Sequence, residues 1–249
     1  MKHAAAHVQH IDCLDGLAKL PTACCDLVYL DPPFMTGRQH IASEGSYSDS
    51  WADLNDYTAF MRPRLEHIHR VLKSTGSVLI HCDWRTCHHF RLMLDELFGS
   101  NQFVNHLIWA YGLGGSSPRR FSRKHDDILF YGKTQDYYFE PPLVPATSNR
   151  LRGKLKKATD VISIPAINNM SHERVGYPTQ KPIALLELLI TACSPPRGLV
   201  IDPFCGSGTT VVAALKCHRK GQGFDRNAQA IKIAQMRIEA IASSGSMQI

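Results

Sequence analysis

Short apolar runs alternate with amphipathic helical patterns along most of this chain, and this alternation constrains the fold more than any other feature. The apolar runs end in turn or acidic residues and have the length of buried strands. They cover residues 8–11, 26–30, 77–81, 106–110, 128–131, 199–201 and 222–224. Helical patterns cover residues 56–72, 85–98, 182–193, 209–217 and 228–241. Such alternation predicts an α/β fold in which helices cover both faces of a mostly parallel sheet.

The composition indicates one soluble domain. With 249 residues, of which 44% are hydrophobic and 20% charged, the chain can bury one large core. We expect a cytoplasmic protein with reduced thiols and no membrane partner, because the sequence has no C-x-x-C pair, no apolar leader and no apolar run of about 18 residues. Cys82, Cys87, His88 and His89 lack the paired spacing of structural zinc sites, so the sequence predicts no metal site.

Two stretches interrupt the alternation. Residues 139–172 contain Pro141, Pro142 and Pro145 followed by a group of cations, and we interpret them as an inserted subdomain or a long loop. Residues 35–55 are rich in Ser, Gly and Asp. We expect this second stretch to be irregular, like a mobile flap beside a site.

The sequence Asp31-Pro32-Pro33-Phe34 follows the second apolar run directly. Asp31 therefore lies at the carboxyl end of a strand, where open α/β sheets bind their ligands. The prolines stiffen the turn and leave the Pro32 carbonyl free, so the Asp31 carboxylate and this carbonyl could accept the two protons of an exocyclic base amine. Phe34 could stack on a base that has left the helix. A simple strand-ending turn remains the alternative.

A glycine-containing loop joins the strand at 199–201 to a helix. It comprises Asp202, Pro203, Phe204, Cys205, Gly206, Ser207, Gly208, Thr209 and Thr210. The glycines permit a close backbone approach, and the free amides of the helix favour an anionic group such as a methionine carboxylate, whose amino group Asp202 could bind. The loop lacks the Gly-Lys-Ser/Thr ending of a nucleotide triphosphate site, and Val211 interrupts a dinucleotide pattern, which leaves NAD as the second candidate cofactor.

Together the two motifs resemble the signature pair of the amino-directed DNA methyltransferases, which use S-adenosylmethionine. The likeness also includes residues 11–14, 70–73, 119–126 and 178–182. Because the catalytic tetrapeptide precedes the cofactor loop, the sequence is similar to the permuted beta class. The resemblance implies a circularly permuted, Rossmann-like methyltransferase sheet of seven strands. Its catalytic part would be residues 1–138, its inserted target-recognition region 139–172, and its cofactor-binding part 173–249.

The resemblance also implies roles for single residues. Asp12 and Cys13 would lie beside the cofactor adenine, Asp225 at its ribose, and the segment with Lys181 would close the pocket. Residues 204–208 would surround the methionine end, and Asp202 and Thr209 would also bind the cofactor. Aspartate at the first position of the tetrapeptide is usual for adenine N6 enzymes and serine for cytosine N4 enzymes, so adenine is favoured and cytosine N4 remains the alternative. Phe34 replaces a commoner tyrosine, and Cys205 a frequent alanine, without loss of stacking or small size.

Two groups of cations are predicted to bind the phosphates of double-stranded DNA. The first comprises Arg119, Arg120, Arg123 and Lys124, and the second comprises Arg150, Arg152, Lys154, Lys156 and Lys157. Asn149, Asn168, Asn169 and His172 could reach base edges beside the second group. A solvated basic loop is the alternative for that group. The class allows a homodimer and a cognate restriction enzyme as partners, and a catalytically silent protein that binds DNA or S-adenosylmethionine is the more remote alternative.

Overall fold

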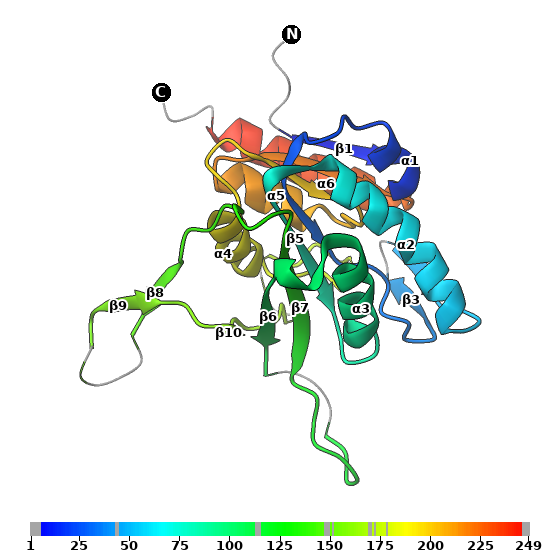
Figure 1. The fold of residues 1–249 in the computed structure, drawn as a ribbon, viewed down its shortest axis with the longest axis horizontal. Coiled ribbons are helices and arrows are strands. Elements are labelled where there is room, and N and C mark those ends of the chain that lie inside the picture. The colour runs from blue at the N-terminus through cyan, green and yellow to red at the C-terminus, as the bar shows by residue number, and fades with distance from the viewer. Residues whose placement is uncertain are drawn as a thin grey trace.

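One eight-stranded sheet forms the centre of the protein (Figure 1), with the strand order β1-β12-β11-β2-β5-β7-β6-β10. The computed structural model describes residues 6–42, 45–112, 116–146, 150, 152–168, 171, 173–177 and 179–245. The strands are β1 (Ala6–His10), β2 (Cys25–Leu30), β5 (Leu72–Cys82), β6 (Phe103–Ala110), β7 (His125–Gly132), β10 (Val161–Ser163), β11 (Leu199–Asp202) and β12 (Lys220–Asp225). Only β7 runs antiparallel to its neighbours β5 and β6, so the predicted mostly parallel sheet is confirmed.

Helices cover both faces of this sheet (Figure 1). They are α1 (Cys13–Ala18), α2 (Leu54–Val71), α3 (Cys87–Phe98), α4 (Ile183–Cys193), α5 (Thr209–Lys216) and α6 (Ala228–Gly245), with a short 3₁₀ turn at Ser100–Gln102. Strand β2 is buried along its whole length. Val28 and Leu30 belong to the apolar cluster that contains α2 and α3, whereas Leu27 and Tyr29 belong to the cluster with α4 and α5. Alternate side chains of one strand thus serve two cores.

Three local features differ from the prediction. The sheet has an eighth strand, β10, which pairs in parallel with β6; this three-residue strand lies within 139–172 and is too short to stand out as an apolar run. The stretch 35–55 is not irregular, because β3 (Arg38–Ala42) and β4 (Gly45–Asp49) form an antiparallel hairpin. Helix α1 was not predicted, since six residues are too few to show helical periodicity.

The parallel strands bring acidic residues to one edge of the sheet. Asp31 follows β2, Asp202 ends β11 and Asp225 ends β12, while Asp12 comes shortly after β1. Because β7 is antiparallel, its beginning, with Asp126, lies at this same edge. We call it the carboxyl edge, and it is where ligands bind in open α/β sheets.

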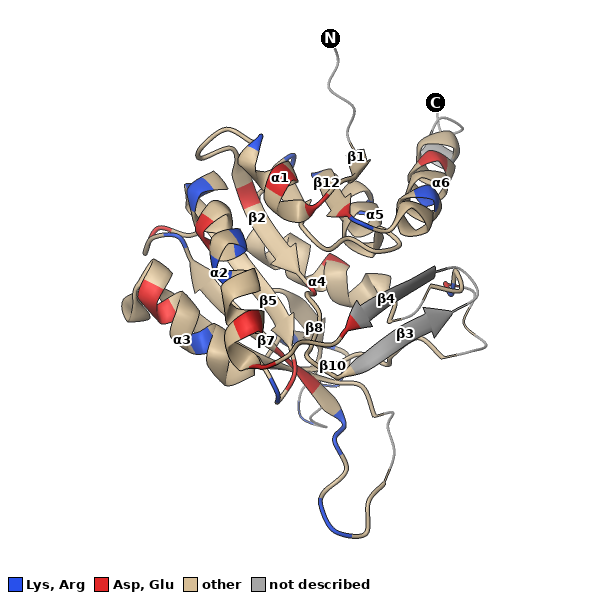
Figure 2. Cartoon of the chain, turned by 90° about the vertical axis from the view of Figure 1, so that its right-hand side faces the viewer, with Lys and Arg blue, Asp and Glu red and all other residues tan. Residues whose placement is uncertain are grey.

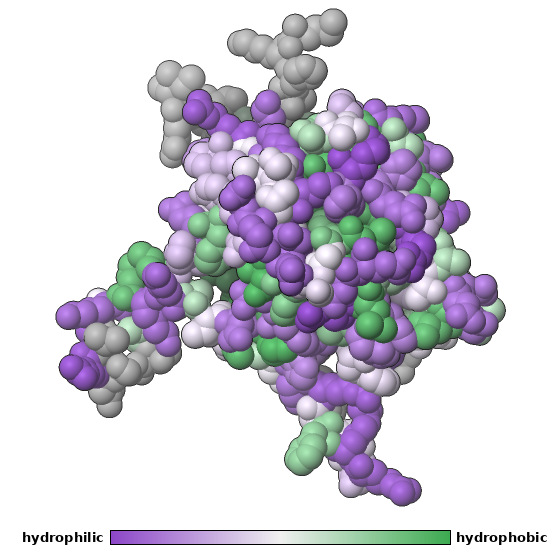
Figure 3. Space-filling model, in the orientation of Figure 1, coloured by the Kyte–Doolittle hydropathy of each residue, from purple (hydrophilic) through white to green (hydrophobic). Residues whose placement is uncertain are grey.

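Two arms project from the body of the protein, and Figure 3 shows the lower one as largely hydrophilic. The first arm is the connection between β6 and β7, described at 111–112 and 116–124. The second arm is the hairpin of β8 (Leu143–Pro145) and β9 (Leu155–Lys157), at the lower left of Figure 1. The part of the chain that the structure describes contains no helix of the length and apolarity that a membrane span requires.

Candidate active site

Asp31 is held in place by a residue that lies 150 positions later in the sequence. Its Oδ2 atom forms an ion pair with Nζ of Lys181, which lies just before α4. Its Oδ1 atom is buried and has no hydrogen-bond partner among the described residues. The Lys181 ammonium also lies 5.4 Å from the centre of the Phe34 ring. Lys181, which the resemblance assigns to the cofactor pocket, therefore contacts the tetrapeptide that begins with Asp31.

The tetrapeptide is fixed by contacts with the helix layer and the sheet. The hydroxyl group of Tyr57 in α2 donates a hydrogen bond to the Pro33 carbonyl at 2.7 Å. The Phe34 ring is stacked on His81, with ring centres 5.9 Å apart. Pro32 and Pro33 line the same cavity as Asp31 and Phe34. The turn therefore presents a carboxylate, proline backbone and an aromatic ring to one space.

A polar network that the sequence did not predict supports this turn. His81, fully buried in β5, contacts the Tyr29 hydroxyl through Nδ1 at 2.7 Å and the Asp126 carboxylate through Nε2 at 3.1 Å. Tyr111 donates a second hydrogen bond to Asp126 at 3.1 Å. Burial alone would raise the pKa of Asp126, but the hydrogen bond from His81 and the charges of His81 and Lys181 lower it below its ordinary value. These residues come from separate strands, and no linear motif connects them.

The loop after β11 is organised around two buried carboxylates. Asp202 accepts hydrogen bonds from the Phe204 amide at 2.9 Å and from the Thr210 hydroxyl. Asp225 accepts one from the Gly206 amide at 2.8 Å. Burial raises the pKa of Asp202 to about 7. The hydrogen bonds from Thr210 and Phe204 lower this pKa less strongly, and the charges of Asp31 and Asp225 add to the increase. Burial also raises the pKa of Asp225.

Gly208 is required by both conformation and packing. Its φ of 79° lies in the left-handed region, and a Cβ atom here would lie 2.7 Å from Cβ of Ala234 in α6. The glycine thus allows α5 to begin directly against α6. The side chain of Arg237, also in α6, donates to the Ser207 carbonyl at 2.7 Å and to the Thr209 hydroxyl at 3.1 Å.

Asp12 and Cys13 lie at the start of α1 and are joined by an arginine that the sequence analysis missed. Asp12 caps the helix by accepting from the Leu14 amide at 2.8 Å. Arg64 of α2 binds both Asp12 oxygens, at 2.9 and 3.1 Å, and the Cys13 sulfur at 3.1 Å. Burial raises the pKa of Cys13 to about 12, so this thiol is neutral. Arg64 lies in an ordinary helical pattern, and only its burial in the folded protein distinguishes it.

A single cavity of about 670 Å³ brings these groups together. Of the predicted catalytic and cofactor residues, Gly208 alone is not part of its lining. The lining includes Asp12, Cys13, Asp31, Pro32, Pro33, Phe34, Lys181, Asp202, Phe204, Cys205, Gly206, Ser207, Thr209 and Asp225, together with Arg64. Its volume lies in the range of small-molecule sites, roughly 300–1,000 Å³. The space, the carboxylates and the close backbone approach at Gly206 suit a nucleoside that carries an amino acid.

The two groups of predicted DNA-binding cations lie on the two arms, outside this cavity. Arg119, Arg120, Arg123 and Lys124 belong to the first arm, which we call the basic loop (Figure 2). The guanidinium group of Arg123 stacks 3.6 Å from the Trp84 ring, just beyond β5. Phe121 in the same loop is 98% exposed. The loop therefore leaves the carboxyl edge beside the cavity.

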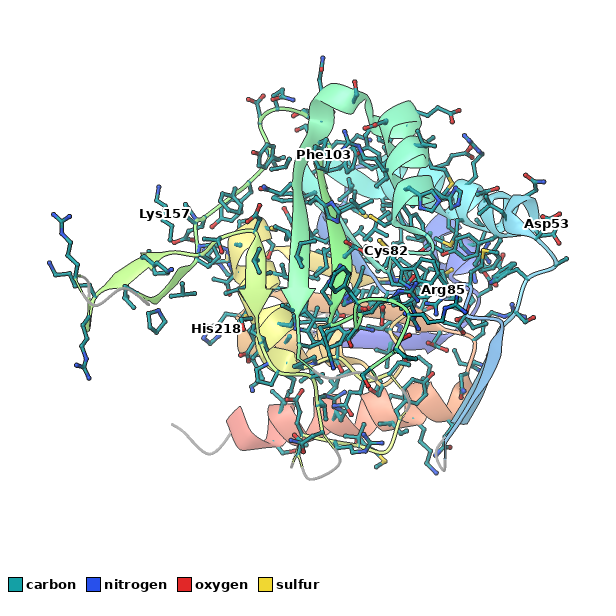
Figure 4. The ribbon with its side chains drawn as sticks, turned by 90° about the horizontal axis from the view of Figure 1, so that it is seen from below. Asp53, Cys82, Arg85, Phe103, Lys157 and His218 are labelled. Carbon is teal, nitrogen blue, oxygen red and sulfur yellow. The ribbon has the colours of Figure 1, made fainter. Side chains whose placement is uncertain are left out.

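The second group lies on the hairpin arm. Arg152, Lys154 and Lys157 are exposed there, and Figure 4 shows Lys157 where this arm joins the body. Arg150 is also exposed, and Lys156 is partly buried. Asn149, Asn169 and His172, which the sequence analysis associates with base edges, lie outside the described residues. The arms are separate elements, so the structure does not bring the two groups into one cluster.

Comparison with known proteins identifies relatives over almost the whole chain. A family model described as DNA methylase, for N6 and N4 methyltransferases, matches residues 25–236. The type II methyltransferase M.HpaI of Haemophilus parainfluenzae is 30% identical, with 91% of this chain and 72% of that protein covered. The DNA adenine methyltransferase YhdJ of Escherichia coli K12 is 27% identical, with 94% and 83% covered.

Solved structures share the fold at lower identity. The cytosine-N4-specific PvuII DNA methyltransferase gives a TM-score of 0.72 at 19% identity, and the alignment covers 96% of this chain and 91% of that one. The complex of M1.HpyAVI with S-adenosylmethionine gives 0.67 at 21%, with 94% and 98% covered. The fold is thus that of the Rossmann-like methyltransferases, as predicted. The family match, which spans most of the sheet and both motifs, shows that this chain belongs to the S-adenosylmethionine-dependent DNA methyltransferases that act on adenine N6 or cytosine N4.

Proposed function

We propose that this enzyme methylates the N6 amine of adenine in double-stranded DNA and that Asp31, Pro32, Pro33 and Phe34 form its catalytic site. The observation that carries the proposal is the asymmetry of the Asp31 carboxylate. Lys181 neutralises Oδ2, while Oδ1 is buried in the cavity wall without a partner among the described residues. An unpaired buried acceptor is unfavourable, so this oxygen is suited to accept a proton of an entering exocyclic amine.

Each of the residues around the cavity is assigned a separate role in the reaction. Bound S-adenosylmethionine supplies the electrophilic methyl group. Asp31 and the Pro32 carbonyl hold the amine protons so that the nitrogen lone pair points toward the methyl donor, and Phe34 stacks on the flipped base. Lys181 pairs with the Asp31 carboxylate and fixes its position. We assign Asp202 to the amino group of the cofactor and Asp225 to its ribose, as the lining of the cavity suggests.

Adenine is preferred over cytosine for two reasons. The tetrapeptide begins with Asp31 rather than serine, and one relative over nearly the whole chain is named a DNA adenine methyltransferase. Cytosine N4 is the competing target, since a fold neighbour is named cytosine-N4-specific. Both bases present an amine beside a ring nitrogen, so the two targets are distinguished by identifying the methylated product.

The decisive experiment identifies the methylated nucleoside. The protein is incubated with S-adenosylmethionine and unmethylated genomic DNA, which is then digested and analysed by mass spectrometry. We expect N6-methyladenine from the wild type and none from Asp31→Ala, whereas Asp15→Asn, a change at an exposed position on α1, retains activity. N4-methylcytosine would overturn the base assignment, and an active Asp31→Ala variant would overturn the catalytic site.

DNA binding is assigned to the two arms. Arg123 of the basic loop stacks on Trp84 just beyond β5, and the hairpin arm carries exposed cations farther along the chain. Exposed cations on projecting segments can neutralise phosphates without using the cavity. Residues 139–172 would then serve as the target-recognition region.

The cellular setting is proposed from the class. A cytoplasmic location suits a DNA substrate. A cognate restriction enzyme is supported by a relative named as a type II methyltransferase, and it is tested by asking whether DNA methylated by this protein resists an endonuclease encoded beside it. A homodimer is tested by light scattering of the protein with and without DNA.

A further inference from the structure

Three potential metal ligands meet on the α3 side of the sheet, outside the lining of the methyl-transfer cavity, and a fourth lies next to one of them. They are Cys82 at the end of β5, Cys87 at the start of α3, His106 in β6 and Asp127 in β7. His106 Nε2 lies 2.6 Å from Asp127 Oδ1 and 3.7 Å from Cys87 Sγ. One ligand atom from each of these last three residues lies within 4.8 Å of the others. The Cys82 thiol interacts with that of Cys87.

These distances are close to those of a tetrahedral metal site. Zinc binds sulfur at about 2.3 Å and nitrogen or oxygen at about 2.0–2.1 Å, so its ligand atoms lie about 3.3–3.8 Å apart. The sulfur to nitrogen distance already has this value. The His106 to Asp127 separation must widen by less than about 1 Å as a metal ion replaces the hydrogen bond. Side-chain rotations of this size leave the strands in place.

The four residues differ in their exposure to solvent, so that an ion can reach the site from one side and be enclosed on the other. The side chain of His106 is 43% exposed and Cys87 is half-buried, whereas Cys82 and Asp127 are buried. In Figure 4 Cys82 lies within the body of the protein, in the same region as Arg85. Two thiolates and a carboxylate more than balance the charge of a divalent cation, and thiolate with imidazole favours zinc over magnesium or calcium. Each thiol that binds releases its proton to solvent.

The geometry points to a zinc site formed by Cys87, His106 and Asp127, with Cys82 as the fourth ligand. It differs from the group of neighbouring cysteines and histidines in the sequence, because His88 and His89 contact each other and are not among the converging residues. The ion would join β5, β6 and β7 to the start of α3. Asp83, Trp84 and Arg85 lie between the two cysteine ligands, so zinc would stiffen the turn on which Arg123 of the basic loop stacks.

Cobalt provides the direct test, since thiolate-bound tetrahedral Co²⁺ absorbs strongly. The full chain, reduced and treated with chelator, is titrated with Co²⁺ and then with Zn²⁺. We expect one equivalent to produce a thiolate charge-transfer band with visible tetrahedral bands, and Zn²⁺ to abolish both. Cys87→Ser should remove the part of the charge-transfer band that the Cys87 thiolate contributes, and Cys82→Ser should weaken the binding of Co²⁺ by at least about tenfold. Cys217→Ser, a half-buried cysteine elsewhere, should match the wild type.

Thermal denaturation gives an independent measurement. Zinc should raise the melting temperature of the wild type and of Cys217→Ser, but not that of Cys87→Ser. Unchanged binding of S-adenosylmethionine verifies that each variant is folded. A wild type without the cobalt spectrum, or a spectrum that both Cys87→Ser and His106→Asn retain, would overturn the assignment whatever the base specificity of the enzyme.

Discussion

Binding of S-adenosylmethionine should depend on pH through Asp202. Burial raises the pKa of this carboxyl group to about 7, so it is about half protonated in the cofactor-free protein at neutral pH. The proposed partner is the ammonium group of the cofactor, which requires the carboxylate form. Binding must therefore release a proton whenever Asp202 is protonated beforehand. We predict that affinity rises with pH up to about 7 and is constant above it.

The magnitude follows from linkage. A tenfold change accompanies each pH unit well below the pKa, which corresponds to about 1.4 kcal/mol. With a pKa of about 7, Kd at pH 6 should be about tenfold weaker than at pH 8, and about thirtyfold weaker at pH 5.5. Asp225, whose pKa is also raised by burial, acts in the same direction.

Isothermal titration calorimetry measures both the affinity and the proton release, if each pH is examined in two buffers of different ionisation enthalpy. The Asp202→Asn variant should bind weakly and lose most of this dependence. Thr210→Val removes a hydrogen bond that lowers the pKa of Asp202, so its transition should move to higher pH. A constant Kd for the wild type between pH 5.5 and 8 would refute the pairing of Asp202 with the cofactor ammonium group.

Three further outcomes follow from the site. Lys181→Met should lower kcat at least about tenfold, because Asp31 loses its counter-ion, and it should leave the Kd of S-adenosylmethionine unchanged. Lys181→Arg should restore part of the rate. A variant with a weaker Kd and an unchanged kcat would contradict the role of Lys181 as the counter-ion of Asp31. Gly208→Ala should lower the free energy of unfolding by at least about 2 kcal/mol in urea titrations. Gly153→Ala has the same φ of 79°, but no atom of the described residues lies within 4 Å of the added Cβ, so it should cost about 1 kcal/mol. Replacing the four cations of the basic loop with alanine should reduce the slope of log Kd for DNA against log salt by up to about 3.6, and an unchanged slope would exclude phosphate contacts.

The helices and strands could be predicted because buried positions are occupied by apolar residues at regular spacings in the sequence. Each of the seven predicted strands and five predicted helices has a counterpart in the structure. Strand β2 was evident because both of its faces are buried. By contrast, β10 has only three residues, and just one of them, Ile162, is buried. The hairpin of β3 and β4 consists mostly of small and polar residues without an apolar alternation, so no hydrophobic period could reveal it.

The site could be predicted where its residues are contiguous. The tetrapeptide and the glycine loop are linear because each turn is made by neighbouring residues. The contact between Asp31 and Lys181 joins positions 150 residues apart and depends on how the two segments pack. Arg64, His81 and Asp126 belong to ordinary strand or helix patterns. Their importance arises only when the sheet places them beside the cavity.

The position of β1 has a consequence for how this protein is made. Strand β1 precedes the other strands of the sheet along the chain, yet this edge strand pairs with β12, in the register Ala6 with Gly221. Strands β11 and β12 also separate β1 from β2, so the late segment enters between two early ones. A nascent chain that stops before this segment leaves the edges of β1 and β2 without those neighbours, and such edges promote aggregation. The sheet, and with it the cavity, can therefore be completed only after β12 has been synthesised.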